Sequence, residues 1–300
     1  MSTPPTTATY RYLTGDGPTL SYLAAGDAAR RPVVFLHGLS SPSTSWTPAM
    51  EHLGSCWPTF ALDLRGHGRS EHTPSHYGLA DYCADVVRLL VEIGESAILV
   101  GHSLGAMVAA ELAQVGHPLV SAVFLEDPPL YVFHADVFAT TDRSWPREAR
   151  RAFPIVRDHV RRLQAERADL AAYVQLVGDS PHPAGDKQRD HLYDDAIHAR
   201  AECLSLMDPD AFTWLVEGTT FRTYEPDRLI ACPVAVLRAD PVLSPAFLPE
   251  DEVRLRASSP HAEVIEMRGA AHNICGDRAT RRRFLKELDR FLEGVARDRH

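Results

Sequence analysis

Residues 97–115 read AILVGHSLGAMVAAELAQV, and this stretch decides the fold class. Its first four residues are apolar, as in a buried strand, and Leu104 to Val115 has the spacing of a helix with one face of small alanines. Gly101, Ser103 and Gly105 between them form the pattern G-x-S-x-G. The pattern predicts a tight turn from strand to helix, with glycines where side chains would clash and a serine at its tip.

This turn makes Ser103 a candidate nucleophile. It lifts the serine hydroxyl above the edge of a sheet and points the backbone N–H of Leu104 at the position where an oxyanion would form. The N-terminus of the following helix adds positive potential there. The alternative interpretation is that Ser103 is only a small residue in a tight turn, with no chemistry.

Short apolar runs alternate with helical patterns on both sides of this stretch. Strands are predicted at 33–36, 59–62, 122–125, 234–237 and 262–267, and helices at 81–93 and 281–295. Strands that are apolar throughout and separated by helices indicate a parallel sheet covered on both faces. Residues 9–25 alternate around Gly15-Asp16-Gly17, which predicts an antiparallel hairpin at the start. The prediction is therefore an α/β fold with a mixed sheet.

One segment interrupts this alternation. About a hundred residues between Leu125 and Val234 contain no good strand candidate, and such a length is too great for a simple connection. Residues 147–167 and 191–206 have helical patterns. We therefore expect a helical cap over residues 131–215, inserted between core segments 1–130 and 216–300.

Three further motifs follow predicted strands: His37-Gly38-Leu39, the segment 63–70 (DLRGHGRS), and Gly269-Ala270-Ala271-His272. In this order, and with Ser103 between them, the motifs resemble the α/β-hydrolase family, in particular its capped esterases and lactonases. The resemblance covers residues 10–298. It implies a mostly parallel eight-stranded sheet, helices on both faces and an inserted helical cap. It also implies that His272 is the general base and that Leu39 supplies a second oxyanion-hole N–H.

The resemblance leaves the acid of the triad open. Some members place it nine residues after a proline in the strand that follows the cap, but that count from Pro233 reaches Val242, and Asp240 lies two residues too early. Other members place it about seven residues after the start of the strand that follows the elbow helix, which gives Asp127. Asp127 is the preferred candidate, with Asp240 and Glu126 as alternatives. An aspartate at either position could also simply cap a turn.

A serine at the elbow argues against epoxide opening and halide displacement, for which relatives carry aspartate. The prediction is hydrolysis of a carboxylic ester or lactone through an acyl-enzyme, without a metal or cofactor. The alternatives are C–C bond hydrolysis, perhydrolysis or a lyase step with the same triad, or a weakly catalytic ligand receptor. Aromatic residues of the cap indicate a medium-sized apolar substrate, some of them lining its pocket: Tyr131, Phe133, Phe138, Trp145, Phe153, Tyr173, Tyr193 and Trp214.

The composition removes other classes of function. The 300 residues contain 31 Lys and Arg against 40 Asp and Glu, a formal net charge of −9, which argues against nucleic acid as a partner. No apolar run approaches a membrane span, the N-terminus lacks the features of a secretory signal, and the five cysteines are scattered. We therefore expect a cytoplasmic protein whose partner is a small molecule. Whether it forms a homodimer stays open.

Overall fold

The computed structural model describes residues 8–26, 29–132 and 135–297. Its eight strands form one sheet in the order β1-β2-β4-β3-β5-β6-β7-β8. The pairs β1·β2 and β2·β4 are antiparallel, and all others are parallel. The strands are β1 (Thr9–Leu13), β2 (Leu20–Ala25), β3 (Val33–Leu36), β4 (Thr59–Leu62), β5 (Ala97–His102), β6 (Val120–Glu126), β7 (Val234–Ala239) and β8 (Glu263–Met267). The predicted fold class, an α/β-hydrolase fold with a mostly parallel eight-stranded sheet, is confirmed.

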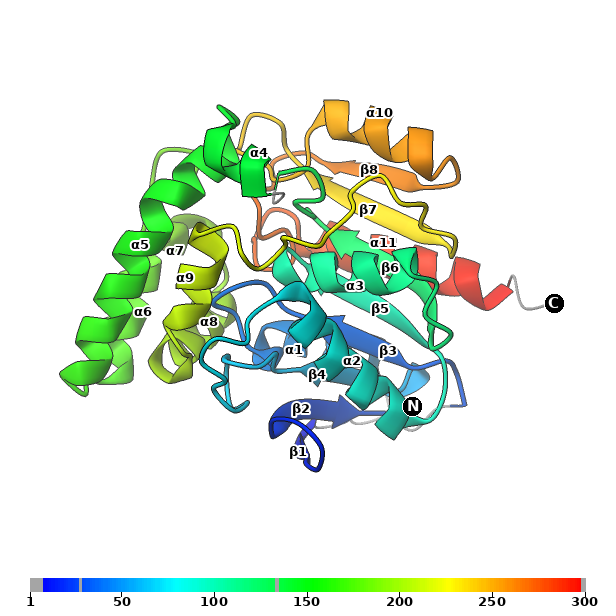
Figure 1. Cartoon of the computed structure of the whole chain (residues 1–300), viewed down its shortest axis with the longest axis horizontal. Helices are drawn as coiled ribbons and strands as arrows, with labels where there is room; N and C mark the ends of the chain where they lie inside the picture. Colours follow the sequence, from blue (N-terminus) through cyan, green and yellow to red (C-terminus); the bar gives the residue numbers. More distant parts are fainter. Residues whose placement is uncertain (1–7, 27–28, 133–134, 298–300) are drawn as a thin grey trace.

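Helices cover both faces of the sheet (Figure 1). One face packs on α1 (Thr47–Leu53) and on α11 (Arg281–Arg297), whose apolar stripe includes Phe284 and Leu288. The other face packs on α2 (Leu79–Ile93), α3 (Leu104–Gln114) and α10 (Pro249–Ser258). The small side chains of Ala106, Ala109 and Ala110 are fully buried, so α3 lies close against the strands.

The parallel strands bring their carboxyl ends to one edge of the sheet. Leu36 is in register with Gly101, and His102 is in register with Glu126. The segments that follow β3, β5, β6, β7 and β8 therefore meet at that edge, which is where open parallel sheets place ligands.

The described residues between β6 and β7 form six helices in place of strands: α4 (Ala135–Thr140), α5 (Ser144–Ala165), α6 (Leu170–Gly178), α7 (Gln188–His191), α8 (Asp194–Leu206) and α9 (Asp210–Val216). Figure 1 shows them gathered beside one end of the sheet. The helical patterns at 147–167 and 191–206 correspond to α5 and α8. The sequence analysis did not predict α1, α4, α6, α7, α9 or α10. Within the described ranges, no helix combines the length and apolarity needed to cross a bilayer.

Candidate active site

Ser103 stands in a strained turn between β5 and α3. Its φ of 49° and ψ of −109° lie in a region that L-residues rarely adopt. A Cβ on Gly101 would lie 2.5 Å from the Gly105 carbonyl oxygen, and one on Gly105 would overlap the Leu36 carbonyl. The Ser103 N–H donates to the Glu126 carbonyl at 3.2 Å. The close packing around the turn thus holds Ser103 at its tip, and it is possible only because Gly101 and Gly105 lack a Cβ.

His272 and Asp127 form a hydrogen-bonded pair. The Nδ1 atom of His272 lies 2.6 Å from Oδ2 of Asp127, whose side chain is fully buried. The same carboxylate accepts the N–H groups of Ala246 at 2.8 Å and Phe247 at 3.2 Å. A carboxylate with these partners fixes the ring and holds its proton at Nδ1, so Nε2 of a neutral His272 is free to accept a proton.

The alternative acid, Asp240, bonds backbone N–H groups, whereas Nδ1 of His272 bonds Asp127. The Oδ2 atom of Asp240 accepts the Gly269 N–H at 2.8 Å, and its Oδ1 accepts the Val242 N–H at 3.1 Å. The second bond is the Asx turn that the sequence offered as the alternative interpretation of this residue. Asp240 therefore holds the turn that precedes His272.

Glu126 lies beneath the turn and also has its own partner. Its side chain is 1% exposed, and its Oε1 accepts the Cys275 N–H at 2.8 Å. Burial raises the pKa of Glu126 to about 8, which favours the neutral acid at pH 7. Burial also raises the pKa of the Cys275 thiol well above its usual value, so this cysteine is not a ready nucleophile.

The loop after β3 passes directly over the serine. A Cβ on Gly38 would lie 2.6 Å from Nδ1 of His102 and 3.2 Å from the Ser103 Cβ. His37 fixes this loop, because its Nδ1 donates to the Gly38 carbonyl at 2.9 Å and its Nε2 accepts the Leu64 N–H at 3.0 Å. Burial lowers the pKa of His37 to about 4, so it stays neutral.

Two aromatic rings contact His272. The rings of His102 and Trp145 have their centroids 4.8 Å and 4.9 Å from its own. His102 donates from Nε2 to the His272 carbonyl at 3.0 Å. Burial, with smaller effects from the charges of His272 and Arg200, lowers the pKa of His102 well below its usual value. His102 thus acts as a neutral support for the histidine loop.

A cavity of about 230 Å³ brings these groups together. Ser103, His272 and both predicted oxyanion-hole residues, Leu39 and Leu104, line it. Of the aromatic residues expected at the pocket, Trp145 and Phe153 line it, whereas Phe133 lies outside the described residues. Among the polar wall residues that the sequence analysis missed, Glu148, His182, Gln188 and Arg200 come from the segment between β6 and β7. No short motif marks them, because they reach the cavity only through the placement of the inserted helices and of the turn between α6 and α7.

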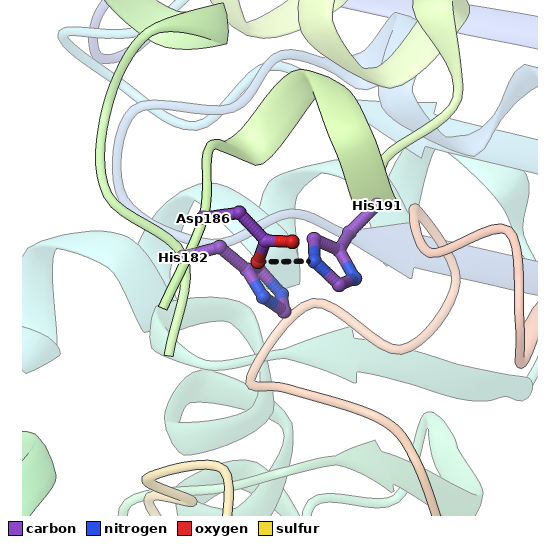
Figure 2. Close-up of side chains that lie close together, drawn as sticks. All are labelled: His182, Asp186 and His191. Carbon is purple, nitrogen blue, oxygen red and sulfur yellow. Dashed lines mark hydrogen bonds and ion pairs between the residues drawn. The ribbon is translucent and has the colours of Figure 1, made fainter. Parts of the chain in front are cut away.

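The wall includes a turn whose side chains could be taken for a metal centre. One ligand atom each from His182, Asp186 and His191 lies within 4.8 Å of the others. Figure 2 shows the three side chains close together. The two rings, however, are stacked with centroids 3.8 Å apart and planes 11° from parallel. Nitrogen lone pairs lie in the ring planes, and nearly parallel planes do not converge on one ion. His191 Nε2 instead bonds Asp186 at 2.8 Å, which holds the turn together.

A strained serine turn and a histidine–aspartate pair, at the carboxyl ends of a parallel sheet with inserted helices, define the class of α/β-fold hydrolases. A family model described as "Alpha/beta hydrolase family" matches residues 33–282. The chain belongs to this family.

Individual relatives are more distant. N-formylmaleamate deformylase of Pseudomonas putida is 35% identical over 100 residues, which are 33% of this chain and 37% of the relative. For this and two other curated relatives, the match spans only 32–37% of their length. The structure of E-2-(acetamidomethylene)succinate hydrolase superposes with a TM-score of 0.69 at 22% identity, covering 96% of this chain and 100% of the other. The enol-lactonase from Burkholderia xenovorans LB400 gives a TM-score of 0.68 at 18% identity, covering 94% and 100%. At such identities the two structures establish the fold alone.

Proposed function

We propose that this chain is a serine hydrolase that cleaves a carboxylic ester or a lactone of a medium-sized, largely apolar substrate. The observation that carries the proposal is the convergence of three groups. Ser103 stands on its strained turn, His272 lines the same cavity, and the buried Asp127 holds Nδ1 of His272 at 2.6 Å.

In this proposal Ser103 Oγ attacks the substrate carbonyl, and His272 Nε2 takes its proton. Asp127 stabilises the imidazolium that forms and keeps the ring oriented. The N–H groups of Leu39 and Leu104 donate to the tetrahedral oxyanion. His272 then returns the proton to the leaving alcohol, and water, activated by the same histidine, hydrolyses the acyl-enzyme.

The choice of an ester or lactone rests on the nucleophile and on the walls of the cavity. Trp145, Phe153 and Leu215 provide an apolar lining beside Ser103, which suits the hydrocarbon part of such a substrate. Because one relative is a deformylase, an N-formyl amide is assayed beside the esters and lactones.

The test combines labelling with turnover. The test compares wild type with Ser103→Ala and with the control Ser205→Ala. Ser205 belongs to α8 and lies outside the cavity lining. Each protein is treated with a fluorophosphonate probe and assayed on 4-nitrophenyl butyrate, a δ-lactone and an N-formyl amide. We expect labelling and ester or lactone turnover in wild type and Ser205→Ala, and neither in Ser103→Ala. Labelling without ester or lactone turnover would assign the triad to another acyl substrate. Ligand binding without labelling would favour a receptor.

A further inference from the structure

The cavity contains an arginine that forms no ion pair with any acidic residue the structure describes. Arg200 comes from α8, is half-buried, and lines the same cavity as Ser103 and His272. Its Nε donates to the hydroxyl of Ser40 at 3.1 Å, and Ser40 directly follows the oxyanion-hole residue Leu39. The guanidinium therefore lies on the side of the cavity where the oxyanion loop runs.

The acids of its own helix are all engaged elsewhere. Asp194, Asp195 and Glu202 of α8 pair with Arg278, Arg281 and Arg69, at 3.0, 2.6 and 3.3 Å. Across the described ranges, no carboxylate oxygen lies within 4.0 Å of an Arg200 nitrogen. Desolvation lowers the pKa of Arg200 from its usual value. A guanidinium that has lost part of its water without gaining a counter-charge is costly, and an anionic ligand would remove that cost.

The positive and negative charges of the cavity wall lie on different helices, Arg200 on α8 and Glu148 on α5. Among its described lining residues, the one carboxylate is Glu148, which is exposed and accepts the hydroxyl of Ser244 at 2.9 Å. The apolar side chains of Trp145 and Phe153 belong to the same helix as Glu148. An anion is thus favoured beside Arg200 and disfavoured beside Glu148, with apolar walls for the rest of the molecule.

We propose that Arg200 binds a carboxylate carried by the substrate, so that the substrate class is an ester or lactone of a largely apolar acid with one additional carboxylate. This inference rests on the proposed function. A guanidinium suits the role because its planar N–H groups can form two parallel bonds to a carboxylate. The Ser40 hydroxyl occupies only Nε and leaves the terminal nitrogens for the ligand.

Other roles of Arg200 would change the kinetics in a different way. If Arg200 served only to position the oxyanion loop through Ser40, or to stabilise the oxyanion by its charge, its loss would slow all substrates alike. Binding of a substrate carboxylate predicts a loss confined to anionic substrates and expressed mainly in KM.

The experiment uses two esters of the same shape: the 4-nitrophenyl monoester of glutaric acid and 4-nitrophenyl 5-methylhexanoate, in which two methyl groups replace the carboxylate oxygens. Spontaneous hydrolysis is subtracted. The variants are Arg200→Gln, Arg200→Lys and the control Arg151→Gln, an exposed arginine of α5. We expect wild type and the control to prefer the anionic ester. Arg200→Gln lowers kcat/KM for that ester by about 10- to 100-fold, the effect of a charged hydrogen bond, with the neutral ester changed less than about threefold and Arg200→Lys intermediate.

Equal losses on both esters, or a wild-type preference for the neutral ester, would overturn the proposal. Wild type alone gives a second test that no folding defect can obscure, because 1 M NaCl should reduce its preference for the anionic ester by screening. Calorimetry with glutarate and Ser103→Ala separates the two proposals. Binding that is lost in the Ser103→Ala, Arg200→Gln double variant supports the anion site even if no ester is hydrolysed, and absence of binding contradicts it.

Discussion

Asp127 Oδ2 lies 2.6 Å from His272 Nδ1, although 145 residues separate the two in the chain and β7 lies between the strands that precede them. The loop after β7 explains how they meet. Its residues Ala246 and Phe247 donate their N–H groups to the Asp127 carboxylate. The loop that supplies the acid in some other members of the family thus supplies hydrogen-bond donors here, and Asp127, the proposed acid, directly follows β6.

The first prediction follows from this arrangement. Asp127→Asn should lower kcat on an ester substrate by about 10⁴-fold, because an amide favours the wrong tautomer of the histidine. Asp240→Asn is the matched control, since the Asp240 carboxylate accepts the backbone N–H groups of Val242 in its own turn and of Gly269. It should keep kcat within about tenfold. Thermal unfolding of both variants checks that folding is intact, and the reverse order of activities would exclude Asp127 as the acid.

Asp127 was predicted through the resemblance to the α/β-hydrolase family, by the spacing that some members show after the strand that follows the elbow helix. The residue count from Val120 could therefore be made without coordinates. Arg200 could not be found in this way. It meets Ser40 across 160 residues, and only the tilt of an inserted helix decides which of its side chains face the cavity.

Helices were missed in the sequence analysis where they show no clear apolar pattern. In α10 only Asp251 and Leu255 are buried, so no apolar stripe marks it. Its start signals, Pro249 with acidic residues in the first turn, were present in the sequence. The strand runs at 33–36, 97–100, 122–125 and 234–237 were found because they are apolar throughout and buried, which is a much stronger pattern.

The second prediction concerns the buried Glu126. Its pKa in the folded protein, about 8, lies above the ordinary value of 4.5. The folded state therefore retains a proton that the unfolded chain releases. The stabilisation is complete at pH values below 4.5 and is lost as pH rises through about 8, with a slope of up to about 1.4 kcal/mol per pH unit.

Glu126→Gln mimics the neutral acid and removes this dependence. We expect urea denaturation to give a free energy of unfolding that falls less steeply between pH 5 and pH 8.5 in Glu126→Gln than in wild type. Glu51→Gln, at an exposed position, should retain the wild-type slope. Parallel curves for wild type and Glu126→Gln would mean that Glu126 is ionised throughout this range.

The third prediction contrasts two glycines. A Cβ on Gly105 would overlap the backbone carbonyls of Leu36 and His37, so Gly105→Ala forces β3 away from the serine turn. We expect a loss of about 1–3 kcal/mol in the free energy of unfolding together with loss of activity. Gly294, in α11, has no atom within 4 Å of the position of its Cβ. Gly294→Ala should add about 0.5–1 kcal/mol through helix propensity and leave turnover unchanged. If Gly105→Ala changed neither stability nor activity, the serine turn would tolerate a wider separation from β3.

The last prediction concerns the turn of Figure 2. Its stacked rings, His182 and His191, present nitrogens in nearly parallel planes, whereas tetrahedral zinc needs ligands that converge at about 2.0–2.1 Å. Binding would require one ring to rotate, and rotation of His191 would break its bond to Asp186. We therefore expect 100 µM ZnCl₂ to leave the thermal unfolding temperature unchanged, since only a ligand that binds the folded state raises it. His182→Ala serves as the control. A zinc-dependent rise in wild type that this variant abolishes would mean that the rings do separate and that the cavity wall contains a metal site.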